Sequence, residues 1–210
     1  MHPLRRLAAL CVLSIAALVQ PLQAQDAPAA DVVVRSTAES IMAAVAANRD
    51  IYATDPAPLR REVRALLGEQ VAFERIARGV MGRHREGATP AQIDRFATVF
   101  TSTLIELYAG ALVALEAESI EVQPAEQSRP DRARVTMEVT TTAGQKFTLF
   151  YSMALGEGGW EVRNMVVNGI NLGVTFRNRF DALASEQGGD VDAVIDAWAE
   201  APVTTAEEAG

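Results

Sequence analysis

The sequence predicts an α+β fold in which helices pack on a twisted antiparallel sheet of about four strands and enclose an apolar cavity. Three observations support this prediction. Apolar residues recur at helical spacing before residue 116, with the longest such run from Pro90 to Leu115. The pattern changes to a period of two between residues 119 and 167, and returns to helical spacing after Leu172. With 49% apolar and 22% charged residues, the composition is that of an ordinary globular protein.

Residues 1–24 have the three parts of a secretory signal peptide. Arg5 and Arg6 provide a positive start, residues 7–19 are apolar, and residues 22–24 (LQA) suit cleavage. This apolar run is short for a bilayer span, so a retained membrane anchor is the weaker alternative. Cys11 follows Leu10 early in the run and lacks the small preceding residue of a lipoprotein site. We therefore expect an exported, unlipidated protein.

Cleavage after Ala24 leaves a chain that suits one domain and contains no cysteine. We expect neither a disulfide nor thiolate chemistry, so stability has to come from an apolar core. Removing Arg5 and Arg6 leaves 17 basic against 27 acidic residues, a formal charge of −10. This balance argues against binding to nucleic acid and against adhesion to anionic lipid surfaces.

The expected domain covers residues 36–199, after a flexible lead-in (25–35) and before a disordered tail (200–210). Its first three helices are expected at 36–48, 59–68 and 73–83. A linker with two prolines, residues 50–58, separates the first helix from the second.

The helix from Pro90 to Leu115 is the element around which we expect the domain to be arranged. Thr89 and Gln92 can form a capping box, and Pro90 suits the first helical position. The helix would be roughly 35–40 Å long, enough for one wall of the domain. Gly110 lies inside it, which suggests a bend or a close approach of another backbone.

Strands are expected at 119–123, 133–139, 146–155 and 160–167, joined by short turns that make neighbours antiparallel. Large apolar residues gather on one predicted face of this sheet. Two more helices follow, from Leu172 to about Gln187 and from Asp190 to about Trp198.

The sequence contains no convincing catalytic or metal-binding group. His84 is the only histidine after the signal peptide and lies in a run of charges, where we expect a solvated side chain. One histidine without cysteine cannot hold zinc, and the glycine-rich segment 156–159 joins two strands rather than opening a helix. A cavity enzyme would have to use Glu106 with Tyr108, but residues two apart face different directions. We expect neither enzymatic activity nor a cofactor.

Two separate blocks carry a family resemblance. FERIARGVMGRHREGATPAQIDRF with LYAGAL, and then WEVRNMVVNGINLGVTFRNRFDALASEQGGDVDAVIDAW, resemble the MlaC or toluene-tolerance family of periplasmic phospholipid shuttles. The similarity covers about residues 36–199. The family usually has Ser where Asn171 stands and often Tyr where Phe176 stands. These departures leave the expected fold unchanged, but they affect the prediction of which lipid is bound.

The resemblance implies a monomeric, non-enzymatic carrier in the periplasm. It would bind phospholipid acyl chains in a cavity of NTF2-like shape and move them between an outer-membrane lipoprotein complex and an inner-membrane ABC transporter. Such transport maintains outer-membrane lipid asymmetry. One branch of the family is associated with hopanoid gene clusters, so a polycyclic lipid is an alternative cargo.

The expected lipid-lining residues combine the long helix, the apolar face of the sheet and the start of the next helix. They are Tyr108, Leu112, Val135, Met137, Phe147, Leu149, Tyr151, Trp160, Val162, Val166, Ile170 and Phe176. A small NTF2-like cavity enzyme and a ligand-free scaffold remain as alternatives, and the scaffold predicts a completely filled core.

Overall fold

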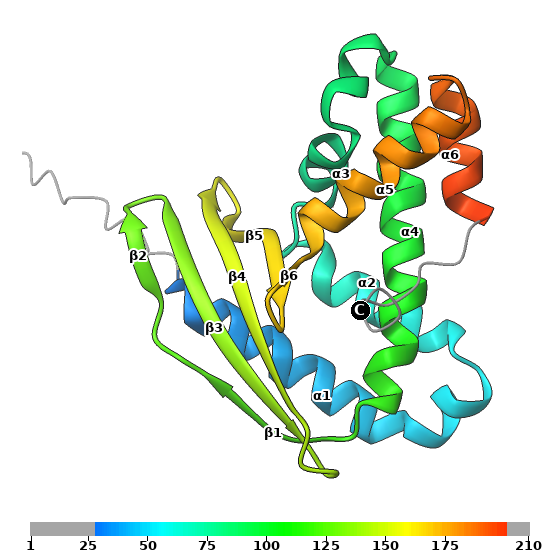
Figure 1. Ribbon diagram of the computed structural model, residues 1–210. Helices are drawn as coiled ribbons and strands as arrows, with labels where there is room; N and C mark the ends of the chain where they lie inside the picture. The colour runs from blue at the N-terminus through cyan, green and yellow to red at the C-terminus, as the bar shows by residue number, and fades with distance from the viewer. Residues whose placement is uncertain (1–27, 201–210) are drawn as a thin grey trace, which may run out of the picture.

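The computed structural model describes residues 28–200 and confirms the α+β class (Figure 1). The helices are α1 (Ala30–Thr54), α2 (Ala57–Gly68), α3 (Phe73–Met81), the 3₁₀ helix η1 (Gly82–Gly87), α4 (Pro90–Ala114), α5 (Leu172–Glu186) and α6 (Val191–Glu200). The strands are β1 (Ala117–Val122), β2 (Glu126–Arg129), β3 (Arg132–Thr141), β4 (Lys146–Gly156), β5 (Gly159–Val167) and β6 (Ile170–Asn171). The expected signal peptide and most of the expected tail lie outside the described residues.

All six strands form one antiparallel sheet, in the order β1-β3-β4-β5-β6, with β2 also paired to β3. The four expected strands are β1, β3, β4 and β5. Strand β2 was not predicted because its four residues are all exposed and show no apolar alternation. Strand β6 was not predicted because it is only two residues long.

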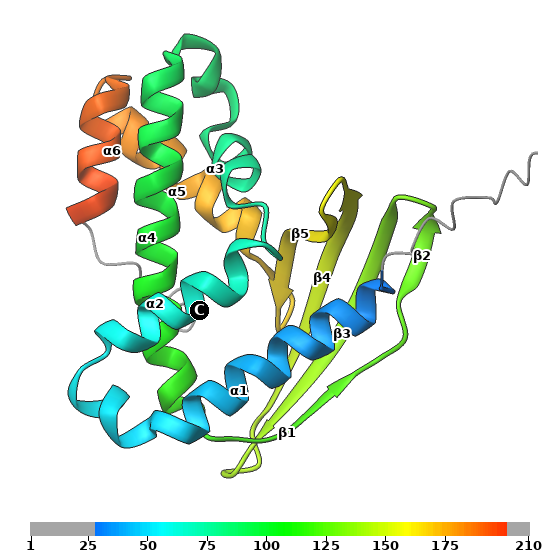
Figure 2. The ribbon, with the colours of Figure 1, turned by 180° about the vertical axis from the view of Figure 1, so that it is seen from behind.

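Helix α1 lies along one face of the sheet, as Figure 2 shows, and it is longer than predicted. Ala30 and Val34 are buried against the sheet, so residues 30–35 are helical where a flexible lead-in was expected. The backbone leaves helical geometry at Asn48, where the prediction ended, but the helix then continues to Thr54. Packing on the sheet therefore extends a helix whose local sequence signals are weak.

Helix α4 contributes to two of the three hydrophobic clusters of the described chain, and the residue that follows it packs against the third. Phe96 and Phe100 belong to a cluster with α3, α5 and α6, and Ile105 belongs to one with α1 and α2. Leu115, just after its last turn, packs against the cluster between α1 and the sheet. The predicted capping box of Thr89 and Gln92 is present.

One of the two roles suggested for Gly110, the close approach of another backbone, is not found in the structure. A Cβ built there would meet nothing within 4 Å, so close backbone approach does not explain this glycine.

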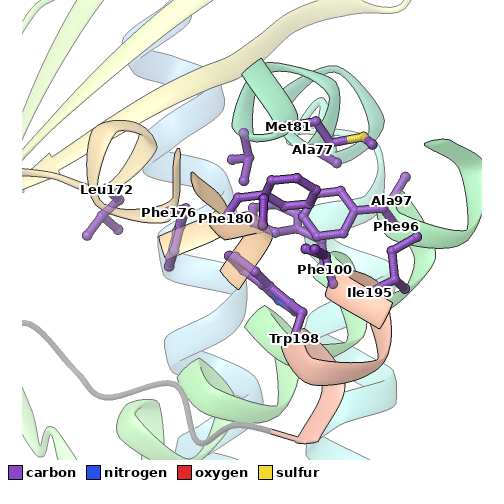
Figure 3. Packing of buried hydrophobic residues seen from close by; sticks show 13 residues of the cluster. Ala77, Met81, Phe96, Ala97, Phe100, Leu172, Phe176, Phe180, Ile195 and Trp198 are labelled. Atoms are coloured by element: carbon purple, nitrogen blue, oxygen red, sulfur yellow. The ribbon is translucent and has the colours of Figure 1, made fainter. Parts of the chain in front are cut away.

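The helical end of the molecule is closed by an aromatic core of Phe96, Phe100, Phe176, Phe180 and Trp198, which Figure 3 shows from close by. The Phe96 ring meets those of Phe180 and Trp198 edge to face, at centroid distances of 4.8 and 5.3 Å. Aromatic pairs favour this geometry because the positive ring edge meets the negative ring face. This region is densely filled.

Two sets of hydrogen bonds join the helical end to strand β5. The Val162 N–H donates to the Gln70 carbonyl at 2.8 Å, and the Ala72 N–H donates to the Val162 carbonyl at 3.1 Å. At the start of α5, Asn164 donates to Asn171 Oδ1 at 3.0 Å and accepts from the Gly173 N–H at 3.1 Å. The sheet and the helices are therefore held in a fixed relation.

Candidate functional site

Some of the apolar side chains that pack against the three clusters are neither buried nor fully exposed. They come from α2, α3, α4, β4 and β5, and each packs against one of the clusters. We call this set the inner wall: Leu66, Leu67, Phe73, Leu104, Tyr108, Leu112, Phe147, Leu149, Tyr151, Val162, Met165 and Val167. Unlike the aromatic core, the inner wall keeps accessible apolar surface.

Tyr151 indicates that this surface faces inward. Burial raises the pKa of the Tyr151 hydroxyl well above its ordinary value, yet the side chain keeps intermediate accessibility. A hydroxyl in bulk water would not be desolvated in this way. We infer that the accessible part of Tyr151 faces a space surrounded by protein. Burial also raises the pKa of Tyr108, which is likewise only partly accessible.

The structure brings most of the predicted lining residues to the clusters that border this space. Val135, Met137 and Trp160 are buried in the sheet cluster, and Phe176 is buried in the aromatic core. The remaining residues at these clusters are part of the inner wall: Tyr108, Leu112, Phe147, Leu149, Tyr151 and Val162.

Val166 and Ile170 are separated from the other predicted residues. Val166 lies directly opposite Phe150, whereas its neighbour Met165 lies opposite Tyr151. Because successive strand residues point to opposite faces, Val166 faces away from Tyr151. Ile170 is 37% exposed in the short strand β6.

A β-bulge explains the position of Val166 and the omission of Met165. The register shifts between Ser152 and Met153, where Met153 pairs with Val162 but Ser152 pairs with Asn164. The extra residue inverts the alternation along β5, so that odd-numbered residues join the inner wall beyond Arg163. Strict alternation in the sequence gives no sign of this inversion.

Other inner-wall residues that were not predicted to line the cavity had a sequence signal. Leu104 precedes Tyr108 by four positions on α4, and Tyr108 precedes Leu112 by four, so the three form one helical stripe. Leu66, Leu67 and Phe73 come from elements that were predicted only as helices.

The residue pair suggested for a cavity enzyme is not brought together. The Glu106 side chain is 73% exposed and lies 3.9 Å from Arg60, on the opposite side of α4 from the stripe that carries Tyr108. Glu106 lines a different feature, a recess of about 300 Å³ between α2 and α4 that also includes Arg60, Arg61 and Arg64. This recess shares no residue with the inner wall.

His84 is not simply solvated, which corrects the expectation for this residue. Its Nε2 lies 2.5 Å from Asp181 Oδ1, and its ring packs 5.7 Å from that of Phe180. The hydrogen bond to His84 and the nearby Arg83 lower the pKa of Asp181. The hydrogen bond between His84 and Asp181 therefore links η1 to α5. Within residues 28–200, no group of three or more His, Cys, Asp or Glu side chains could hold a metal ion.

These features define a class of protein: an α+β domain whose helices and antiparallel sheet border an incompletely covered apolar wall. The chain belongs to the MlaC protein family, whose sequence model matches residues 35–200. This is a family of lipid-binding carriers and not of enzymes, so the expectation of a non-enzymatic protein is confirmed at the level of the family.

Two known proteins illustrate the relationship. The chain is 33% identical over 168 residues to the toluene tolerance protein ttg2D of Pseudomonas putida, and the alignment covers 80% of this chain and 78% of that protein. A phospholipid-binding protein from Ralstonia solanacearum, solved in complex with a phospholipid, has a TM-score of 0.75 and 24% identity. That match covers 82% of this chain and 96% of that one, and it supports the fold.

Along residues 28–200, none of the helices is both long enough and apolar enough to cross a membrane.

Proposed function

We propose that this protein is a periplasmic lipid carrier that binds the acyl chains of a phospholipid against the inner wall. It shuttles the lipid between an outer-membrane complex and an inner-membrane ABC transporter and so supports outer-membrane lipid asymmetry. The observation that carries the proposal is the contrast in packing within one chain. The side chains of the aromatic core are buried, whereas the inner wall, which is also apolar, keeps accessible surface.

Physical chemistry explains why such a wall needs a ligand. Each methylene group exposed to water costs roughly 0.8 kcal/mol, so an acyl chain with ten exposed methylenes costs about 8 kcal/mol. A lipid therefore crosses an aqueous compartment slowly unless a protein covers its chains. The inner wall and the acyl chain remove each other's apolar surface from water, and no catalytic group is required.

Family membership supports the same function, as do the names of the relatives. The Ralstonia protein, which shares the fold, was solved with a phospholipid, and the Pseudomonas relative is described as a toluene tolerance protein. The partner complexes on the two membranes are inferred from family membership alone. The amino-terminal pattern of residues 1–24 supports export to the periplasm.

The test is to purify the protein from a Gram-negative host, extract it with organic solvent and analyse the extract by mass spectrometry. We expect phospholipid at close to one molecule per protein. An extract without lipid would refute carriage, and a polycyclic lipid in place of phospholipid would select the hopanoid alternative.

A substitution connects the bound lipid to the inner wall. Leu112→Arg places a charge on the wall and should lower the lipid content severalfold while the circular dichroism spectrum stays unchanged. The matched control is Ile51→Arg, because Ile51 is 55% exposed on α1 and its substitution should leave lipid content unchanged. Equal lipid content in both variants would remove Leu112 from the binding surface.

A further inference from the structure

The three tyrosines of the chain differ in what their hydroxyl groups contact. The Tyr52 hydroxyl donates to Glu62 Oε2 at 2.5 Å. The hydroxyls of Tyr108 and Tyr151 have no hydrogen-bond partner among residues 28–200, and both side chains remain partly accessible. Buried tyrosine hydroxyls usually find a partner, because the phenol group is a strong donor. Neither the Tyr108 nor the Tyr151 hydroxyl oxygen is fully buried, so both take their hydrogen bonds from whatever fills the space that they face.

Their surroundings are apolar on both sides of the site. On the sheet, the direct cross-strand neighbours of Tyr151 are Val135 and Met165. On α4, Tyr108 packs against the cluster that contains Phe100 and Phe176, and Met165 packs against the same cluster. Burial raises the pKa of both hydroxyls, which keeps them protonated and able to donate.

Filling the site with a lipid changes the surroundings of these hydroxyls. Acyl chains on the inner wall would displace any water and offer no acceptor. Each hydroxyl would then be an unpaired donor in an apolar site, an arrangement that costs more than a satisfied hydrogen bond returns. The bound lipid must supply the acceptors if it is to bind without this penalty.

A diacyl lipid carries suitable acceptors where its chains begin. The ester carbonyls are neutral, adjoin the methylene chains and accept hydrogen bonds. The phosphate group fits less well, because none of these neighbouring side chains is a cation and an unpaired charge in apolar surroundings is costly. Neutral ester carbonyls can accept from the two hydroxyls and carry no charge that the apolar surroundings would disfavour.

We propose that Tyr108 and Tyr151 form a polar subsite within the inner wall, where their hydroxyls donate hydrogen bonds to the ester carbonyls of a diacyl lipid. The subsite rests on the proposed function and deepens it. It selects ester-linked acyl lipids over apolar molecules of similar size, and it fixes how far the chains enter the protein.

The test compares two lipids that differ only at the linkage. The delipidated full chain is offered equal amounts of dioleoyl phosphatidylethanolamine and its dialkyl ether counterpart, and native mass spectrometry counts each complex. The ether lacks the carbonyls, so the wild-type protein should favour the ester about fivefold. At 1.4 kcal/mol per tenfold, this is about 1 kcal/mol, the size of one neutral hydrogen bond.

Tyr151→Phe removes one of the two donors but keeps the ring, so its ester-to-ether ratio should fall towards one. Tyr108→Phe should lower the ratio in the same direction. Tyr52→Phe is the matched control, because its hydroxyl is bonded to Glu62, and it should keep the wild-type ratio. A general loss of packing would weaken binding of both lipids together and leave the ratio unchanged.

Three outcomes would count against the subsite. Equal binding of both lipids to the wild type, or a preference that survives in both phenylalanine variants, overturns the subsite and leaves lipid carriage intact. Failure to bind either lipid overturns carriage itself. If a phenylalanine variant does not fold, infrared spectroscopy of the wild-type complex decides. The ester carbonyl stretch must lie below its position in hydrocarbon, and an unshifted band overturns the proposal.

Discussion

The aromatic core and the inner wall are both apolar, but the core is buried and the wall stays partly accessible. In the core, α3, α4, α5 and α6 cover one another, and Phe96, Phe100 and Phe180 have no accessible surface. At the wall, residues such as Leu149 and Leu112 pack against a cluster on one side only and stay partly accessible. Apolar character alone therefore does not distinguish the core from the proposed binding surface, whereas the extent to which other side chains cover it does.

The largest expected effect contrasts one residue from each region. Phe96→Ala should cost about 3–5 kcal/mol of unfolding free energy, because it leaves a cavity beside the three rings that contact it. Leu149→Ala should cost only about 1 kcal/mol in the delipidated protein, since part of this side chain is already accessible. Urea unfolding of both lipid-free variants measures the difference. Equal losses would mean that the wall is ordinary core.

A smaller effect is expected where the two regions join. A Cβ at Gly173 would lie 2.6 Å from Asn164 Oδ1, which accepts from the Gly173 N–H. Gly173→Ala should displace Asn164 and cost about 1–3 kcal/mol. In contrast, Gly110→Ala in α4 should stabilise the protein by about 0.5–1 kcal/mol, because nothing opposes the added methyl group. Thermal unfolding compares the two, and a neutral Gly173→Ala would show that the junction is not tightly held.

The smallest effect concerns the outer side of the aromatic core, where Asp181 contacts His84. The pKa of Asp181 is lowered in the folded protein, chiefly by its hydrogen bond to His84. Its stabilising contribution is therefore fully present above the unfolded-state pKa of 3.8 and is lost as the pH falls through the lower folded-state value. Urea unfolding from about pH 6 to about pH 3 should show a shallower pH dependence for Asp181→Asn than for wild type. Identical slopes would contradict this contribution.

The sequence predicted the elements whose signals are local. The Thr89–Gln92 cap, the long helix after it and the four main strands could all be read from spacing and end signals. The start of α1 could not, because Ala30 is held in a helix by contacts with a distant sheet. Strand β2 could not either, since its exposed residues pair with β3 through backbone groups alone.

The candidate site was predictable to the extent that strands alternate regularly. The face of β3 and most of that of β4 follow the expected pattern, with Val135 and Met137 buried. The bulge opposite Arg163 is a property of strand pairing, so the inward orientation of Met165 and the outward one of Val166 required the structure. Partial accessibility, which distinguishes wall from core, likewise depends on neighbours far away in the sequence.

The segment between α2 and α3 has a consequence for how separate molecules behave. A free strand edge displays unpaired N–H and C=O groups, which recruit strands from other chains and promote aggregation. At the β5 edge, β6 occupies Val166 and Val167, and the Gln70–Ala72 segment occupies Val162. Only a short stretch remains between them. The connection that joins the helices to the sheet thereby also covers this edge, which leaves fewer free backbone groups there for a strand of another copy.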